Sequence, residues 1–167
     1  TGALTLRIGK AEAVLPKAEQ IGGESVQEGD YIKVYVVDVL EGLKGPKAII
    51  TRTRPELVKR MFETEVPEIY DGTVEIKAVA REAGSRTKLA VLSHNPDVDA
   101  VGACIGTRGG RVNEIVEELG GEKIDIVEYS EEPEKFVAAA LSPANVLSVE
   151  LSEGEVRACK VTVPDSQ

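Results

Sequence analysis

The stretch Val101-Gly-Ala-Cys-Ile-Gly106-Thr-Arg-Gly109-Gly-Arg111-Val112 decides how the rest of this chain is interpreted. Gly106 and Gly109 are separated by two residues, and apolar residues recur at helical spacing on both sides. A dinucleotide-binding loop requires G-x-G-x-x-G directly after a strand, and a nucleoside-triphosphate loop requires Gly-Lys-Ser/Thr. Neither pattern is present, so the stretch predicts a tight G-x-x-G turn between two helices.

A G-x-x-G turn between two helices is typical of KH domains, which clamp about four nucleotides of single-stranded RNA. The two glycines allow the backbone to approach a sugar–phosphate chain without a clash of Cβ atoms. The N–H groups that open the following helix then face the phosphates, together with the positive end of the helix dipole. Arg108 and Arg111 add positive charge at the same edge. The structural alternative is a plain corner between two helices that binds nothing.

The segments around this turn predict a mixed α+β unit. Their order is helix, two strands, helix, turn, helix and strand. The expected bounds are Pro55–Glu65, Val74–Arg81, Lys88–Ser93, Val98–Ile105, Gly106–Gly110, Val112–Leu119 and Lys123–Tyr129. Asp97 is the expected N-cap of the second helix. This order of elements favours the KH interpretation over a plain corner.

The two ends of the chain predict further modules. The N-terminal third is rich in β-branched residues, with strands expected at Leu4–Ile8, Glu12–Leu15, Tyr31–Val39 and Lys47–Thr53. So few strands cannot close a barrel, so we expect a missing strand before Thr1. The C-terminal segment repeats the order helix–strand–strand, at Pro133–Leu141, Val146–Leu151 and Val156–Val163. It stops before a second G-x-x-G turn, as expected of a truncated tandem module.

The composition is that of a folded protein, because 42% of the 167 residues are apolar and 29% are charged. No apolar run approaches the ~20 residues of a membrane span, and the N-terminus lacks the features of a signal peptide. Cys104 and Cys159 are far apart, so we expect no disulfide framework and a cytoplasmic location. One histidine and two cysteines do not furnish a zinc site, and we expect no cofactor.

The net charge of −9 argues against nucleic-acid binding, because phosphate contacts depend on Lys and Arg. Between Arg52 and Lys123, however, 11 basic residues stand against 13 acidic ones. Most of the acidic excess therefore lies outside the G-x-x-G unit, which leaves room for a locally positive face. An acidic protein-binding module is the alternative that the overall charge favours.

An enzyme is the second alternative. The stretch Ser93-His-Asn-Pro-Asp97-Val-Asp99 resembles the opening motif of DHH-type metal-dependent phosphoesterases, in which a histidine and two aspartates bind manganese. That motif has one more residue between His and Asn, and the family needs further histidines downstream. Because His94 is the only histidine in the chain, a two-metal site cannot be assembled, and we expect no catalytic residue. A turn followed by a helix cap is the simpler interpretation.

Four strings in this chain resemble the NusA family of bacterial transcription factors. They are Phe62–Glu82, Asp99–Gly106, Gly121–Ile126 and Ala139–Ala144, and the similarity extends over essentially the whole chain. The resemblance implies an OB-fold barrel lacking its first strand at 1–51, a type II KH domain at 52–130 and a truncated second KH domain at 131–167. It also implies single-stranded RNA binding, and modulation of pausing, termination and antitermination of RNA polymerase.

The resemblance further implies which residues contact RNA. The phosphate-facing loop consists of Gly106, Thr107, Arg108 and Gly109, and a further phosphate contact comes from Arg111. The groove for the bases is lined by Val101, Cys104 and Ile105, with Ile126 from the adjacent strand segment Ile124–Val127. For Cys104 and Ile105 the alternative is a place in the core. The RNA polymerase elongation complex is an expected partner of the full-length protein, and a membrane is not.

Overall fold

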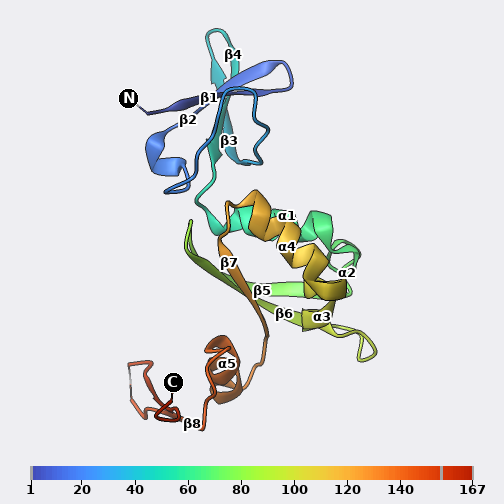
Figure 1. Ribbon diagram of the computed structural model, residues 1–167, viewed down its shortest axis with the longest axis vertical. Coiled ribbons are helices and arrows are strands. Elements are labelled where there is room, and N and C mark those ends of the chain that lie inside the picture. The colour runs from blue at the N-terminus through green and yellow to red at the C-terminus, as the bar shows by residue number, and fades with distance from the viewer. Residues whose placement is uncertain (1, 155, 167) are drawn as a thin grey trace.

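The chain forms three units that follow one another along the long axis of the molecule (Figure 1). A computed structural model describes residues 2–154 and 156–166. The first unit is a pair of β-hairpins, the second is a three-stranded sheet covered by helices, and the third is one helix with one hairpin. The α+β class predicted from the sequence is confirmed.

The N-terminal unit consists of two antiparallel hairpins. Strand β1 (Leu4–Ile8) pairs with β2 (Ala11–Leu15), and β3 (Tyr35–Gly42) pairs with β4 (Gly45–Thr51). A 3-10 turn, η1 (Lys17–Glu19), lies between the hairpins. Ala13, Leu15 and Ile50 form the small core where β2 and β4 pack together. The strands remain two separate sheets and do not close a barrel.

The central unit is a two-layer structure. Its sheet has the order β5-β6-β7, with β5 (Val74–Glu82) antiparallel and β7 (Lys123–Glu128) parallel to β6 (Arg86–Ser93). The helical elements are α1 (Pro55–Glu65), α2 (Pro67–Tyr70), α3 (Ala100–Ile105), the 3-10 turn η2 (Thr107–Gly109) and α4 (Gly110–Glu118). In Figure 1, α1 and α4 cover one face of this sheet.

The main hydrophobic core lies between that sheet and its helices. Helix α1 contributes Leu57, Val58, Met61 and Phe62, whose spacing places all four on one face of the helix. On β6, alternate residues point into the same core, because successive side chains of a strand face opposite sides. Those residues are Leu89 and Val91. The periodicity of the sequence is therefore sufficient to predict this part of the core.

The C-terminal unit packs less tightly against the rest of the chain. It contains α5 (Pro133–Ala140) and the antiparallel pair β8 (Ser148–Leu151) and β9 (Cys159–Thr162). The ring of Phe136 meets the ring of Tyr129 edge to face, with centroids 5.0 Å apart. No residue of α5 is fully buried. Among the described residues, no helix combines the length and the apolar character needed to cross a membrane.

The structure corrects two predicted element boundaries. Strand β3 begins at Tyr35, because the backbone N–H and carbonyl of Lys33 bind the side chains of Glu118 and Arg52 and not a neighbouring strand. Helix α3 begins at Ala100 with Asp99 as its N-cap, so the prediction of Asp97 as the cap was wrong. The backbone N–H of Asp97 instead binds the side-chain oxygen of Asn95 in a turn. Helix α2 was not predicted.

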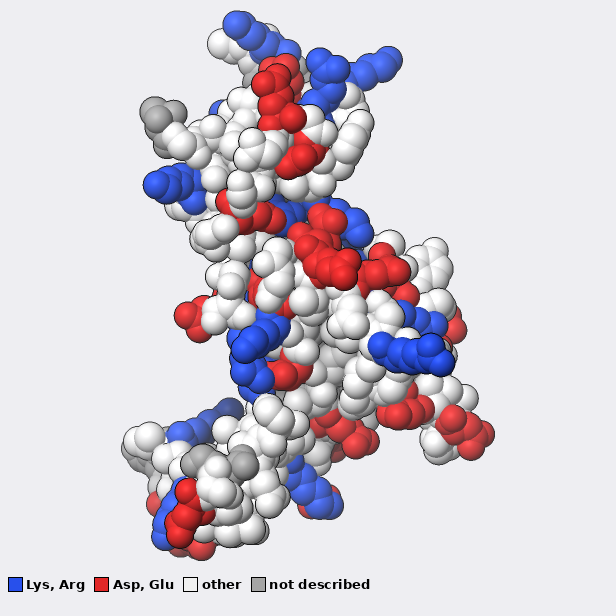
Figure 2. Space-filling model, viewed as in Figure 1, with Lys and Arg blue, Asp and Glu red and all other residues white. Residues whose placement is uncertain are grey.

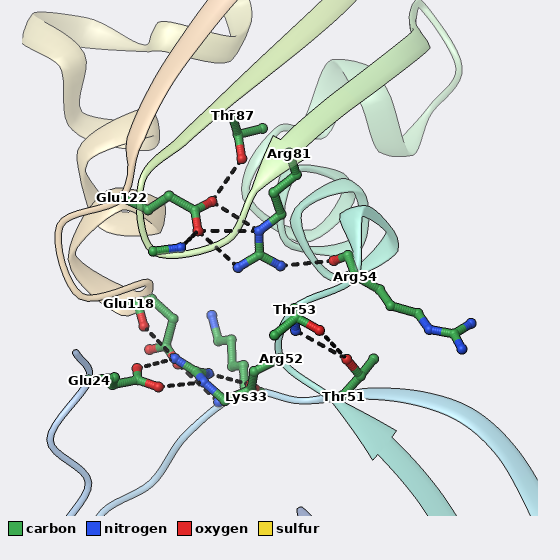
Figure 3. A network of polar contacts seen from close by, with 11 residues as sticks. Glu24, Lys33, Thr51, Arg52, Thr53, Arg54, Arg81, Thr87, Glu118 and Glu122 are labelled. Atoms are coloured by element: carbon green, nitrogen blue, oxygen red, sulfur yellow. Dashed lines mark hydrogen bonds and ion pairs between the residues drawn. The ribbon is translucent and has the colours of Figure 1, made fainter. Parts of the chain in front are cut away.

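A buried ion pair fixes the turn after α4 to the sheet (Figure 3). The side chains of Arg81 and Glu122 have no exposed surface, and they pair at 3.0 Å. The Glu122 carboxylate also accepts hydrogen bonds from the Gly84 N–H at 2.7 Å and the Thr87 hydroxyl at 2.8 Å. A buried carboxylate needs several donors because it has lost its hydration shell. These bonds therefore hold together β5, β6 and the start of β7.

A second buried cation, Arg52, joins the N-terminal unit to the central unit (Figure 3). Its guanidinium has no exposed surface and makes a two-pronged contact with the Glu24 carboxylate. It also donates to the carbonyl oxygens of Lys33 and Glu118, the latter at 3.1 Å. Because Glu24 and Lys33 belong to the first unit and Glu118 ends α4, one side chain fixes the position of that helix end.

Replacing Arg52 with methionine should lower the free energy of unfolding by about 3–5 kcal/mol, because it leaves the Glu24 carboxylate, whose side chain is only 13% exposed, without its cation. Arg54→Met is the matched control, since the side chain of Arg54 is exposed and such changes cost within about 0.5 kcal/mol. Urea unfolding followed by circular dichroism measures both. Equal effects of the two substitutions would show that the Arg52 cluster does not stabilise the fold.

Candidate functional site

The loop between α3 and α4 has a backbone that most residues avoid. Gly106 has φ 75°, Arg108 has φ 54° with ψ 30°, and Gly109 has φ 77°. Arg108 is the one non-glycine residue with positive φ in the described chain, and this conformation is costly for a residue with a Cβ. A Cβ on Gly106 would lie 2.7 Å from Cγ of Arg111, so glycine is required there for space as well.

Helix α4 begins directly at this loop with an open N-terminus. Gly109 is its N-cap, no side chain caps it, and its first turn contains no acidic residue. The first N–H groups of a helix lack partners inside the helix and carry the positive end of its dipole. Thr107 and Arg108, which precede the helix, are both exposed. The N–H groups of Gly109 and Gly110 bond the carbonyls of Gly106 and Thr107. The loop therefore presents one exposed cation beside the positive end of the α4 dipole, which favours an anion.

The opposite end of α4 is acidic. Glu114 and Glu117 are exposed, and Glu118 lies beside the guanidinium of Arg52 with 3.9 Å between Oε1 and Nη1. Figure 2 shows acidic side chains gathered where the N-terminal unit meets the central unit, and interspersed charges elsewhere on that face. The charge of α4 is therefore polarised along its length, and the net charge of −9 does not describe its N-terminal end.

The residues predicted to line a groove occupy different positions. Val101 and Ile126 are half-buried and pack against the main core, while Ile105 is 38% exposed beside the loop. Helix α3 lies next to β7, and Val101 and Ile126 pack against the same core, whereas Ile105 lies outside it. Cys104 has no exposed surface and belongs to the core. For Cys104 the core alternative holds, and the groove-lining prediction is corrected.

Arg111 lies behind the loop. Its Nη1 atom donates to the carboxylate of Glu68 at 2.9 Å and to the carbonyl oxygen of Ala103 at 2.7 Å. The Arg111 and Glu68 side chains are each 32% exposed. Glu68 was not identified from the sequence. Pro67 is the feature of the sequence that could have predicted helix α2, which positions Glu68, because proline is favoured at the first position of a helix.

The stretch that resembles a phosphoesterase motif forms an exposed surface turn. Nε2 of His94 lies 2.8 Å from Oε2 of Glu75, and this hydrogen bond lowers the pKa of the Glu75 carboxyl, with a further contribution from Lys77. Within residues 2–154 and 156–166, no group of three histidine, cysteine or acidic side chains is placed to hold a metal ion. The neighbour of His94 is thus the Glu75 carboxylate on β5.

Comparison with known families identifies the central unit. Residues 52–129 match the family described as NusA-like first KH domain. These bounds contain α1 through β7 and include the G-x-x-G turn between α3 and α4, the turn that is typical of KH domains. The match agrees with the order of elements predicted from the sequence.

Relatives extend the similarity to almost the whole chain. The transcription termination/antitermination protein NusA of Halalkalibacterium halodurans is 56% identical over 160 residues, which cover 96% of this chain and 42% of that protein. The protein of the same name from Mycobacterium tuberculosis is 50% identical, with 99% and 49% covered. That from Thermus thermophilus is 46% identical, with 99% and 43% covered. The chain spans less than half the length of these relatives.

The two cysteines should differ sharply in reactivity. Burial raises the pKa of the Cys104 thiol to about 12, so almost no reactive thiolate forms at neutral pH, whereas Cys159 is exposed. Iodoacetamide at pH 8, followed by mass spectrometry, should modify Cys159 in the folded protein and both residues in urea. Rapid modification of Cys104 in the folded protein would mean that this side chain faces the groove.

Proposed function

The chain belongs to the NusA family of transcription termination/antitermination proteins, and from this membership we propose that it binds single-stranded RNA at the Gly106–Gly109 loop. The observation that supports the proposal most directly is the open N-terminus of α4, which follows two glycines and an exposed arginine. The helix dipole and the exposed Arg108 side chain are available to a phosphate, whereas the N–H groups of Gly109 and Gly110 already bond the carbonyls of Gly106 and Thr107.

The loop residues have distinct parts in this proposal. Gly106 and Gly109 allow the close approach of the sugar–phosphate backbone, because neither carries a Cβ. The N–H groups at the start of α4 donate to phosphate oxygens. Arg108 supplies an exposed positive charge, and Thr107 offers a hydroxyl beside it. The helix dipole adds to the attraction of an anion at this end.

The bases would lie on the surface beside the loop. Val101 of α3 and Ile126 of β7 are half-buried against the same core, and Ile105 is exposed at the end of α3. Aliphatic side chains at this place provide an apolar floor for unstacked bases, which single-stranded RNA exposes and a duplex does not. We therefore propose single-stranded RNA as the ligand, with no cofactor needed.

A finer division of the chain accompanies this function. We assign 1–51 to a partial OB-fold, 52–130 to a type II KH domain and 131–167 to the beginning of a second KH domain. The packing of β2 against β4 supports the first assignment, and the parallel pair β6–β7 supports the second. The order α5, β8, β9 repeats the order α1, β5, β6 and supports the third.

The activity of the full-length protein extends this proposal. The relatives are named for transcription termination and antitermination, and we propose that this chain supplies RNA contacts to a factor that modulates pausing and termination by RNA polymerase. Such a factor acts in the cytoplasm. The acidic end of α4 favours a second role for that surface, binding of a protein partner, which does not require the loop.

Arg108→Glu tests the loop with Lys135→Glu as its matched control, because each substitution reverses one exposed positive charge. Arg108→Glu should weaken binding of a short labelled single-stranded RNA at least tenfold, since it places a carboxylate where a phosphate must lie. Lys135→Glu, on α5, should change the affinity less than twofold. Fluorescence anisotropy at low salt measures affinity, and circular dichroism confirms folding.

Four outcomes bear on the proposal. Selective loss of binding in Arg108→Glu supports the loop as the RNA site. Equal weakening by both substitutions would show that only the overall charge matters. Unchanged affinity of folded Arg108→Glu would contradict the loop assignment, and absence of binding by the unmodified chain would favour the protein-binding alternative.

A further inference from the structure

Arg111 was expected from the sequence to contact a phosphate, but its contacts point to a different role. The distances of 2.9 Å to Glu68 and 2.7 Å to the Ala103 carbonyl place Nη1 against protein acceptors. Pairing with a carboxylate largely cancels the charge of a guanidinium, which then attracts a phosphate only weakly. We propose that Arg111 is a positioning residue that holds the Gly106–Gly109 loop in its RNA-binding shape; this rests on the proposed function of the loop.

The contact with Ala103 connects the two helices on either side of the loop. Ala103 lies in the last turn of α3, where backbone carbonyls have no N–H partner within the helix. Arg111 lies in the first turn of α4 and reaches back to one of these carbonyls. A guanidinium beside the C-terminal end of α3 is also favourable for the dipole of that helix. This hydrogen bond therefore links the end of α3 to the start of α4, the two points between which the loop runs.

The stem of the Arg111 side chain supports the loop directly. A Cβ built on Gly106 would lie 2.7 Å from Cγ and 3.0 Å from Cβ of Arg111, so the backbone of Gly106 rests on this stem. With φ 75° at Gly106 and φ 54° at Arg108, the loop needs external contacts to keep its conformation. Arg111 provides one such contact through the Cβ and Cγ atoms of its side chain.

Glu68 completes the arrangement from α2. Its carboxylate pairs with Arg111 and lies close enough to Cys104 to contribute to the raised pKa of that thiol. By charge alone, Glu68 repels RNA from the adjacent loop. If its part is to hold Arg111 in place, removal of its charge will nevertheless weaken RNA binding. If instead Arg111 contacts a phosphate and Glu68 competes with that phosphate for the guanidinium, removal of the Glu68 charge will strengthen RNA binding.

Three variants, Glu68→Gln, Arg111→Gln and Arg108→Gln, separate these roles. Affinity for a short single-stranded RNA is measured by anisotropy at several salt concentrations. Each phosphate contact on a single strand contributes about −0.7 to the slope of log K against log salt. We expect Arg108→Gln to make the slope shallower by about that amount. Arg111→Gln and Glu68→Gln should each weaken binding about three- to tenfold at an unchanged slope.

The double variant Glu68→Gln/Arg111→Gln serves as an internal check. Because both residues act through one arrangement, it should bind no more weakly than Arg111→Gln alone. Tighter binding by Glu68→Gln, a shallower slope in Arg111→Gln, or unchanged affinity in Arg111→Gln would each overturn the positioning role. The four variants and the unmodified chain are compared well below their unfolding temperatures, so that loss of stability does not appear as loss of affinity.

The positioning role can also be tested without RNA. In ¹H–¹⁵N NMR spectra, Glu68→Gln and Arg111→Gln should both move the amide signals of Thr107, Arg108 and Gly109. Lys135→Glu, on α5, should leave those signals in place. Unmoved loop amides in Glu68→Gln would overturn the role. If the loop amides move but the unmodified chain binds no RNA, the positioning role stands and the proposed function of the loop fails.

Discussion

The guanidinium of Arg52 is bound by acceptors from three segments of the chain: the Glu24 carboxylate, the Lys33 carbonyl and the Glu118 carbonyl. A cation with no exposed surface has lost its hydration, and it is tolerated only when most of its five N–H groups find acceptors. The three acceptors must therefore keep fixed positions relative to one another. The hairpins of the first unit and the end of α4 consequently behave as one framework, although only a short connection joins them.

Helix α4 connects the region fixed by Arg52 to the candidate RNA site. Its C-terminal end is held by Arg52, and the residues that follow it are held by the buried pair of Glu122 and Arg81. Its nine residues span about 14 Å, at 1.5 Å per residue, and its N-terminal end carries the loop. Arg111 and Glu68 fix that second end. A loop held at both sides loses little conformational entropy when it binds, which favours affinity from few contacts.

The sequence predicted the elements well where periodicity decides them. Helix α1 has the predicted bounds, and β5, β6 and β7 agree within two residues, because their apolar residues alternate or recur at regular spacing. The charged residues inside the structure could not be predicted this way. Arg52, Arg81 and Glu122 belong to types that are almost never fully buried, and only their partners from distant segments explain them. Likewise, the sequence contains no local signal for the ion pair of Arg111 with Glu68, because the two residues lie 43 positions apart.

The acidic net charge is compatible with RNA binding when the number of phosphate contacts is small. A site with one free cation and a few N–H groups depends weakly on counterion release, with a salt slope near −0.7 for a single contact. In the binding mode that we propose, most of the affinity comes from hydrogen bonds at the start of α4 and from bases on the aliphatic surface beside the exposed Ile105. The acidic residues at the other end of α4 repel a phosphate chain from the rest of the surface. In the proposed binding mode, an RNA strand therefore gains from contact at the loop, and the negative charge elsewhere on α4 disfavours other contacts.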